Sequence, residues 1–250
     1  MTDIILETRS LTRDFQGFTA VKDVDLKVRR HSIHALIGPN GAGKTTIFNL
    51  ISKFLSPSAG SIFYKGEDIS PLSPAAVARR GLVRSFQISA TYPRMTVRNN
   101  VRIALQRPLG TSFEFWRSET SLAVLHARAD ELLAAVGLLD AADAMAAELP
   151  YGRKRALEFA TTLALDPEML LLDEPTSGLG QEDIARISSL IRSAAASRTV
   201  LMVEHNLSVV AELSDTITVL ARGQVLADGS YAEVSRNPLV IEAYMGTRDA

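Results

Sequence analysis

The sequence predicts an α/β protein with a smaller antiparallel β subdomain and a helical insertion. Three features of the 250-residue chain support this fold class. A short, mostly apolar run at residues 33–37 is followed by a glycine-rich loop and then by a helical pattern. Helical and strand patterns alternate after residue 162. Residues 4–28 show the short alternating runs of antiparallel strands, whereas residues 88–161 show mainly helical spacing.

The glycine-rich loop is the most specific motif in the chain. It fits the phosphate-loop pattern G-x-x-x-x-G-K-[ST] at every fixed position and consists of Gly38, Pro39, Asn40, Gly41, Ala42, Gly43, Lys44, Thr45 and Thr46. The glycines let backbone N–H groups point inward, and the helix that follows adds free N–H groups and its positive dipole end. Lys44 supplies a positive charge for the outer phosphates, and the Thr45 hydroxyl is placed to ligate Mg²⁺. An ordinary glycine-rich turn is the alternative, which the Lys44-Thr45 pair disfavours.

The composition is that of a soluble globular protein and excludes several classes. Hydrophobic residues make up 46% of the chain and charged residues 22%, the net charge is −1, and there are no cysteines. These values disfavour nucleic acid or anionic lipid as the main partner, and they exclude disulfides and thiolate metal sites. We see neither a signal-peptide pattern nor a membrane-spanning run. We therefore expect a cytoplasmic protein that reaches a membrane only through another protein.

The N-terminal part carries the first candidate binding residue. Residues 4–28 predict antiparallel strands, and Phe15 lies in a turn between two of them. An aromatic ring there can stack on a nucleobase or pack in the sheet, and the pattern alone favours packing. A hairpin is expected around residues 65–66, a helix over 74–80, and a strand over 82–86 that ends at Gln87. A glutamine at the end of a core strand can reach a metal or a water.

The middle of the chain divides the predicted domain. Residues 97–105 and 122–136 have helical spacing, residues 108–116 predict an irregular connection, and Trp116 is expected to be a packing anchor. We therefore assign residues 1–87 and 162–250 to the α/β core with its β subdomain, and residues 88–161 to a helical insertion. Another helix is predicted to begin near Pro150 and to run to about residue 164.

Acidic residues and a histidine follow two apolar strands in the second half. Residues 169–172 form a fully apolar run that predicts a buried strand, with Asp173 and Glu174 at its end. Solvated turn acids are the alternative, which the buried strand disfavours. After a helix over 182–196, a strand over 199–203 is followed by His205. Beyond it we expect a helix over 207–213, a hairpin of strands over 216–220 and 225–227, and short helices over 231–235 and 239–245.

In this order, the elements resemble the ATPase subunit of ATP-binding cassette (ABC) transporters over almost the whole chain. Within that family the sequence is most similar to the branched-chain (hydrophobic) amino acid uptake subunits. The resemblance rests on IGPNGAGKTTIFN at 37–49, RSFQ at 84–87, MTV at 95–97, YG at 151–152, LLLDEP at 170–175, VEHN at 203–206, EAYMG at 242–246 and the long segment over 105–124. It implies a P-loop NTPase core of the RecA-like type in the ABC ATPase architecture, with residues 88–161 as the helical signature subdomain.

The resemblance also implies roles for individual residues, with ATP and Mg²⁺ as the ligands. The loop amides and Lys44 would hold the phosphates, with Thr45, Gln87 and Asp173 at the Mg²⁺. Glu174 would be the general base for the attacking water, with His205, Gln87 and Lys44 as the other catalytic residues. Phe15 would stack on the adenine, which reverses the interpretation from the pattern alone. Tyr151 and Gly152 would close over the nucleotide of a second ATPase subunit, identical or related, in a head-to-tail dimer.

Partners and location also follow from the resemblance. It implies separate membrane permease subunits, a periplasmic or extracellular binding protein in the same system, no nucleic acid, and a peripheral position on the cytoplasmic face of the inner (cell) membrane. The imported cargo would be branched-chain or hydrophobic amino acids or a similar small carboxylate. Alternatives are an ABC ATPase for lipid or lipopolysaccharide transport, a soluble ABC ATPase of translation or DNA repair, and a nucleotide-dependent regulator that does not hydrolyse ATP.

The sequence departs from the family pattern at three positions. The usual signature is Leu-Ser-Gly-Gly-Gln, but here Pro150 replaces the serine and Arg153 replaces the glutamine. Pro150 removes a hydroxyl and an N–H from the γ-phosphate contacts, whereas Arg153 can add positive charge there. Gly180 stands where the family often has Asp or Asn. We therefore expect weak ATPase activity in the isolated subunit, which rises when the subunit meets its membrane partner.

Overall fold

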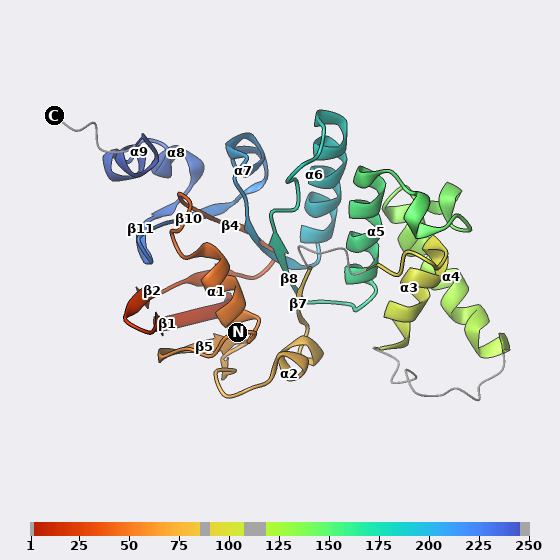
Figure 1. Ribbon diagram of the computed structural model, residues 1–250, viewed down its shortest axis with the longest axis horizontal. Helices are drawn as coiled ribbons and strands as arrows, with labels where there is room; N and C mark the ends of the chain where they lie inside the picture. The colour runs from red at the N-terminus through yellow and green to blue at the C-terminus, as the bar shows by residue number, and fades with distance from the viewer. Residues whose placement is uncertain (1–2, 86–90, 108–118, 246–250) are drawn as a thin grey trace.

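The computed structural model describes residues 3–85, 91–107 and 119–245, and it contains two β-sheets with helices around them (Figure 1). Phe86, Gln87, the connection over 108–116 and Trp116 lie outside the described residues.

The larger sheet positions the functional residues. Its strand order is β11-β10-β4-β9-β8-β7, and β10, β4, β9, β8 and β7 run parallel. The bounds of the six strands are β4 Ile33–Ile37, β7 Leu82–Arg84, β8 Met169–Asp173, β9 Thr199–Val203, β10 Thr216–Ala221 and β11 Gln224–Gly229. Strands β4, β8 and β9 are buried along their whole length, which explains why their sequences are mostly apolar. Because the strands are parallel, their carboxyl ends lie at one edge of the sheet.

The smaller sheet is antiparallel and covers one side of the core. It has the order β2-β1-β5-β6, with β3 also paired to β1. The bounds are β1 Ile4–Phe15, β2 Phe18–Val24, β3 Lys27–Arg29, β5 Ala59–Tyr64 and β6 Glu67–Asp68. Helix α1, Lys44–Ile51, lies between the two sheets, and its buried Ile47 and Phe48 join apolar residues of both sheets in one cluster. Burial of this face holds the start of α1 at the edge of the parallel sheet.

Three helices between β7 and β8 form the right-hand part of Figure 1. They are α3 Val97–Gln106, α4 Glu119–Ala135 and α5 Tyr151–Leu163, and two 3-10 turns, η1 Leu139–Ala141 and η2 Ala146–Glu148, connect α4 to α5. Val101 of α3, Leu133 of α4 and Leu157 of α5 are fully buried and belong to the same hydrophobic cluster. The predicted helices at 97–105 and 122–136 are thus confirmed, the first with one more residue and the second from 119 to 135.

The remaining helices pack around the parallel sheet, and two of them follow its last strand at the C-terminal end of the chain. They are α2 Pro74–Arg79, α6 Gln181–Ala195, α7 Leu207–Leu213, α8 Tyr231–Val234 and α9 Pro238–Met245. Ser73 caps α2, and Asn206 caps α7, through side-chain oxygens that accept backbone N–H groups. Over the described ranges, no helix has the length and apolar character that a bilayer crossing requires.

Candidate nucleotide-binding and hydrolysis site

The phosphate loop joins the carboxyl end of β4 to the start of α1. Gly38 and Gly43 have φ angles of 152° and 101°, which side chains on L-residues rarely permit. A Cβ at Gly38 would lie 2.2 Å from the Leu220 carbonyl oxygen, and one at Gly43 would lie 2.7 Å from that of Ala20. Both glycines are therefore required by the backbones that pack against the loop.

Lys44 occupies the inside of this loop. Its Nζ atom donates hydrogen bonds to the carbonyl oxygens of Gly38 at 2.6 Å and Pro39 at 2.9 Å. Burial lowers the pKa of Lys44, and the charges of Glu174 and Asp173 partly oppose that effect. The ammonium is thus placed between the loop and two carboxylates. Thr45 next to it is exposed, and the first turn of α1 has no side-chain cap, so its N–H groups remain available to an anion.

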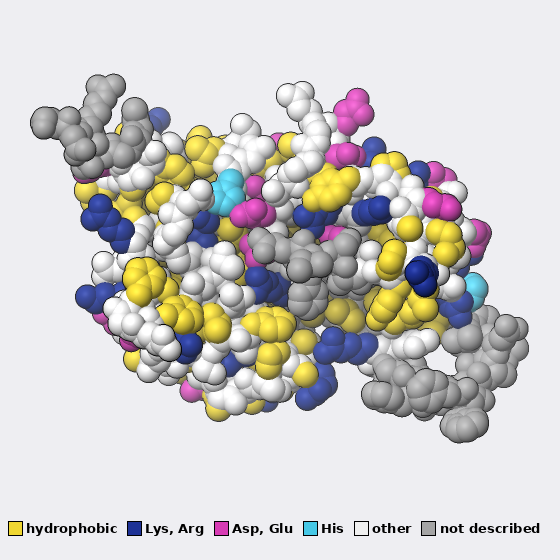
Figure 2. Space-filling model, in the orientation of Figure 1, with side chains coloured by type: hydrophobic (Ala, Val, Ile, Leu, Met, Phe, Trp, Pro, Cys, Tyr) yellow, Lys and Arg dark blue, Asp and Glu magenta, His cyan; other side chains and the backbone are white. Residues whose placement is uncertain are grey.

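Glu174 and His205 are brought together at the ends of two adjacent strands. Nε2 of His205 lies 2.7 Å from Oε1 of Glu174. Glu174 has a φ of 49°, and its N–H donates to the Val203 carbonyl oxygen at 2.9 Å. This left-handed turn directs the side chain out of the strand, so that the Glu174 side chain is 28% exposed rather than buried in the sheet. In Figure 2, a histidine adjoins acidic side chains in the upper part of the visible face, left of its centre.

Glu204 holds the segments that carry these two residues, a role that the sequence did not indicate. Its Oε1 accepts hydrogen bonds from the N–H of Thr176 at 2.9 Å and from the Thr176 hydroxyl at 2.5 Å. Its Oε2 accepts from the N–H groups of His205 at 2.9 Å and Asn206 at 3.1 Å. One buried carboxylate therefore joins the turn after Glu174 to the turn that contains His205. The sequence feature that could have indicated this role is the position of Glu204 directly after the buried strand β9.

Asp173 makes an ion pair that the sequence did not predict. Its Oδ2 lies 2.5 Å from Nη2 of Arg84 at the end of β7, and Nη1 of Arg84 donates to Oδ1 of Asn49 at 2.6 Å. The Asp173 side chain is completely buried, and its Oδ1 atom has no hydrogen-bond partner among the described residues. Asp173 therefore has one oxygen committed to Arg84 and one oxygen that still requires a donor.

Phe15 lies at the end of β1 with 39% of its surface exposed. This exposure excludes the alternative in which Phe15 packs inside the sheet. The guanidinium of Arg13 lies 4.6 Å from the centre of the Phe15 ring, which leaves ring surface available for another planar group.

The signature segment begins helix α5 in the helical part of the chain. Tyr151 is 51% exposed, accepts a hydrogen bond from Arg155 at 3.0 Å, and lies against Gly178. Gly152 is buried, and a Cβ there would lie 2.1 Å from Cγ of Asp183 in α6. In the described part of the chain, these contacts join Tyr151 and Gly152 to α5, α6 and the turn before α6, with none to the phosphate loop.

Two of the departures from the signature pattern have structural consequences. Pro150 is the N-cap of α5 and provides no side-chain hydrogen bond to the helix. Arg153 pairs with Asp140 and also donates to the Gly137 carbonyl oxygen at 3.4 Å. The expectation that Arg153 adds free positive charge is therefore wrong for this conformation, because Asp140 already neutralises the guanidinium.

Comparison with known proteins agrees with this geometry. The family model described as "ABC transporter" matches residues 21–177, and the model described as "Branched-chain amino acid ATP-binding cassette transporter" matches residues 224–250. The first match contains the phosphate loop and the strand that ends in Asp173. The second match contains β11, α8 and α9.

Two branched-chain amino acid transport ATP-binding proteins are similar to this chain over nearly their full length. The chain is 38% identical to the high-affinity branched-chain amino acid transport ATP-binding protein BraF of Pseudomonas aeruginosa, with 98% of this chain and 99% of BraF covered. It is 35% identical to the corresponding protein LivG of Escherichia coli K12, with the same coverage.

A solved structure shares the architecture. The ADP conformation of MJ1267, described as an ATP-binding cassette of an ABC transporter, superimposes with a TM-score of 0.85 at 29% identity, covering 98% of this chain and all of that one. The dimeric bacterial cassette MJ0796 has the same fold, with a TM-score of 0.76 at 23% identity, covering 90% of this chain and 98% of that chain. The chain therefore belongs to the ABC transporter family as an ATP-hydrolysing cassette, with the C-terminal region of the branched-chain amino acid group.

Proposed function

We propose that this cassette powers the import of branched-chain or hydrophobic amino acids, or a similar small carboxylate, through separate permease subunits. The observation that carries the proposal is the match over 224–250 to the branched-chain model, together with full-length similarity to BraF and LivG. The same observation favours this function over lipid or lipopolysaccharide transport and over soluble ABC ATPases.

The described residues support a direct hydrolysis mechanism. The amides of the loop and of the first turn of α1 bind the triphosphate, and Lys44 exchanges its two carbonyl contacts for phosphate oxygens. Glu174 accepts a proton from the attacking water, whose oxygen bonds to the γ-phosphorus while the bond to the β-phosphate oxygen breaks. His205 exchanges its Nε2 contact with Glu174 for a hydrogen bond donated to the γ-phosphate. Phe15 stacks on the adenine with its exposed ring.

The residues near the loop fit a magnesium ion. The unpartnered Oδ1 of Asp173 can accept from a metal-bound water, and the exposed Thr45 hydroxyl can be a direct ligand. Mg²⁺ keeps several waters and takes phosphate ligands, so one or two protein oxygens are enough to hold it beside a triphosphate. When bound, Mg²⁺ neutralises charge on the phosphates. Gln87 completes this set in the proposal, but it lies outside the described residues.

Gly152 is the basis for proposing a second ATPase subunit. It lies at the first turn of α5, which no side chain caps, so the N–H groups of this turn can donate to an anion. We place these amides on the nucleotide bound by a partner cassette, identical or related, in a head-to-tail dimer. In that arrangement residues 88–161 act as the signature subdomain and residues 1–87 and 162–250 as the core. The assembly lies on the cytoplasmic face of the inner (cell) membrane, and a periplasmic or extracellular binding protein delivers the cargo.

Uptake by cells that lack this gene tests the proposal. Wild-type chain should restore accumulation of radiolabelled leucine or a related small carboxylate, whereas Lys44→Ala should not. Restoration of lipid or lipopolysaccharide export instead, with no effect on uptake, would contradict the proposed cargo while leaving the ATPase assignment intact. The matched control is Lys22→Ala, which removes an exposed lysine outside the phosphate loop.

A further inference from the structure

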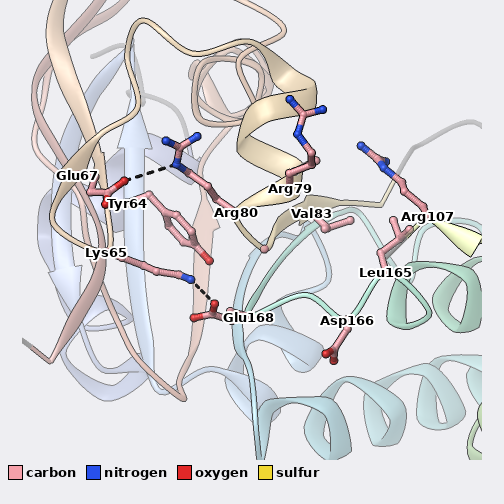
Figure 3. A pocket seen from close by; sticks show the side chains of 12 residues that line it. Tyr64, Lys65, Glu67, Arg79, Arg80, Val83, Arg107, Leu165, Asp166 and Glu168 are labelled. Atoms are coloured by element: carbon pink, nitrogen blue, oxygen red, sulfur yellow. Dashed lines mark hydrogen bonds and ion pairs between the residues drawn. The ribbon is translucent and has the colours of Figure 1, made fainter. Parts of the chain in front are cut away.

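A second cavity lies at the edge of the parallel sheet opposite the phosphate loop. It has a volume of about 790 Å³ and is formed by the β5–β6 hairpin, the end of α2, the start of β7, the end of α3 and the α5–β8 connection (Figure 3). We call it the rear pocket. Its volume falls within the range of roughly 300–1,000 Å³ that is typical of small-molecule sites. The nucleotide site described above does not use any of its lining residues.

The rear pocket has more positive charge than its own acids neutralise. Lys65 forms an ion pair with Glu168, and Nε of Arg80 lies 3.5 Å from Oε2 of Glu67. Asp166 is the third acidic residue that lines the pocket. Its Oδ1 lies 3.2 Å from Nη2 of Arg198, an arginine outside the pocket. Each acidic side chain of the pocket therefore already has a positively charged partner.

Two arginines of the pocket have no such partner. Within the described ranges, the guanidinium groups of Arg79 and Arg107 make no hydrogen bond or ion pair. Figure 3 shows them on the same side of the pocket, turned away from the Lys65–Glu168 and Arg80–Glu67 pairs. Two guanidinium groups on one side of a pocket provide more N–H donors than one carboxylate can accept, but they match the oxygens and charge of a phosphate.

Tyr64 adds an independent indication of a ligand. The residue is only 1% exposed, and its hydroxyl is buried with no hydrogen-bond partner in the described structure. It lines the pocket, and Figure 3 shows its hydroxyl pointing into the space between Arg80 and Glu168. Burial raises the pKa of Tyr64, so the hydroxyl stays protonated and can donate. A buried donor without an acceptor is costly, and a ligand oxygen would remove that cost.

We propose that the rear pocket binds a small phosphate ester, with the phosphate held by Arg79 and Arg107 and an oxygen of the organic part accepting a hydrogen bond from Tyr64. Val83 and Leu165 supply an apolar wall for the carbon atoms. The ester is either a free metabolite or the headgroup of an anionic phospholipid, since both present the same chemistry to the pocket.

Such a ligand would join two parts of the fold. Arg79 is in the last turn of α2 beside the core, whereas Arg107 follows the end of α3 in the helical segment. A phosphate that contacts both would tie these helices together. It would also sit beside Val83, the neighbour of Arg84, which pairs with Asp173.

Isothermal titration calorimetry tests the proposal by measuring the affinity of the rear pocket. The full chain is first saturated with Mg-ADP so that the phosphate loop is filled. The probes are inorganic phosphate, sn-glycerol 3-phosphate, and vesicles of phosphatidylglycerol compared with phosphatidylcholine. We expect Arg79→Gln and Arg107→Gln each to weaken binding roughly 10-fold or more, the scale of a charge-assisted hydrogen bond. Tyr64→Phe should abolish the preference for the ester over inorganic phosphate while leaving phosphate affinity unchanged. Because both arginines contact one phosphate, the effects of the two substitutions should not be additive.

The matched control is Arg236→Gln, which removes another exposed arginine without a described partner and should leave binding unchanged. Both arginines of the pocket lie at helix C-termini, where a cation can also be structural. Lower melting temperatures with unaltered affinity would assign them to that role and overturn the proposal. Binding of vesicles alone, lost in the same variants, would identify the headgroup as the ligand and support the proposal. Absence of binding to the ester and to the anionic vesicles would overturn it.

Discussion

Nε2 of His205 lies 2.7 Å from Oε1 of Glu174, although the two residues are 31 positions apart in the chain. The contact exists because β8 and β9 are adjacent parallel strands, so their carboxyl ends project from the same edge of the sheet. Both side chains retain exposed surface, at 45% for His205 and 28% for Glu174, and can therefore reach a substrate. The mechanism proposed above for ATP hydrolysis depends on this pair.

Glu174→Gln should lower ATP turnover by roughly 10²–10⁴-fold, because an amide cannot accept a proton from the attacking water. Nucleotide affinity should persist, since the phosphate loop is unchanged, and the variant should accumulate as an ATP-bound dimer. Phosphate release and size-exclusion chromatography with Mg-ATP measure the two effects. Glu182→Gln, at an exposed acid in the first turn of α6, is the control. Parental turnover in Glu174→Gln would show that another group is the base.

Arg84→Met should destabilise the folded chain by about 3–5 kcal/mol, because it leaves the fully buried Asp173 carboxylate without its cation. Urea unfolding measures the change. Mg-ADP should stabilise the variant more than the parent, since the metal supplies charge near the same carboxylate. Arg128→Met removes the exposed pair with Glu131 and should cost no more than about 1 kcal/mol. Equal losses in both variants would mean that burial of Asp173 is not the cause.

Gly152→Ala should lower stability by roughly 1–3 kcal/mol, because the added Cβ would lie 2.1 Å from Cγ of Asp183. Adding Asp183→Ala makes room and should recover most of that stability. If Gly152 also approaches a partner's nucleotide, ATP-dependent dimerisation should stay impaired in the stable double variant. Asp183→Ala alone is the control for loss of the carboxylate. Full recovery of dimerisation would assign Gly152 to packing against α6 and nothing more.

The stability of the fold should decrease as the pH falls from about 6.5 to about 4 because of His34. This residue is 1% exposed, its Nε2 lies 2.7 Å from the Thr218 hydroxyl, and burial lowers its pKa from 6.5 to about 4, with Asp228 opposing the shift. The unfolded chain therefore binds a proton in this window that the folded chain does not, which favours unfolding at low pH by up to about 3 kcal/mol.

His34→Gln removes this titration. The free energy of unfolding, measured in urea at several pH values, should lose the corresponding part of its slope between pH 4 and 6.5. Carboxylates titrate in both proteins, so the difference between parent and variant isolates His34. Identical slopes would show that His34 does not titrate differently in the two states.

The sequence by itself determined the fold class and the ATPase activity, and it predicted the residues of the main site. The phosphate loop is contiguous, and its glycines, lysine and threonine act through local backbone geometry, which can be predicted without a tertiary structure. The buried strand that ends in Asp173, next to Glu174, was equally evident, because a fully buried parallel strand is mostly apolar.

Only the tertiary structure decided which side chains meet. It paired Arg84 with Asp173, used Glu204 to join Thr176 to the turn of His205, exposed Phe15, and neutralised Arg153 with Asp140. It also gathered Tyr64, Arg79 and Arg107 around the rear pocket from three distant segments. Contacts of this kind depend on strand order and helix placement, which arise from burial summed over the whole chain, so no local pattern encodes them.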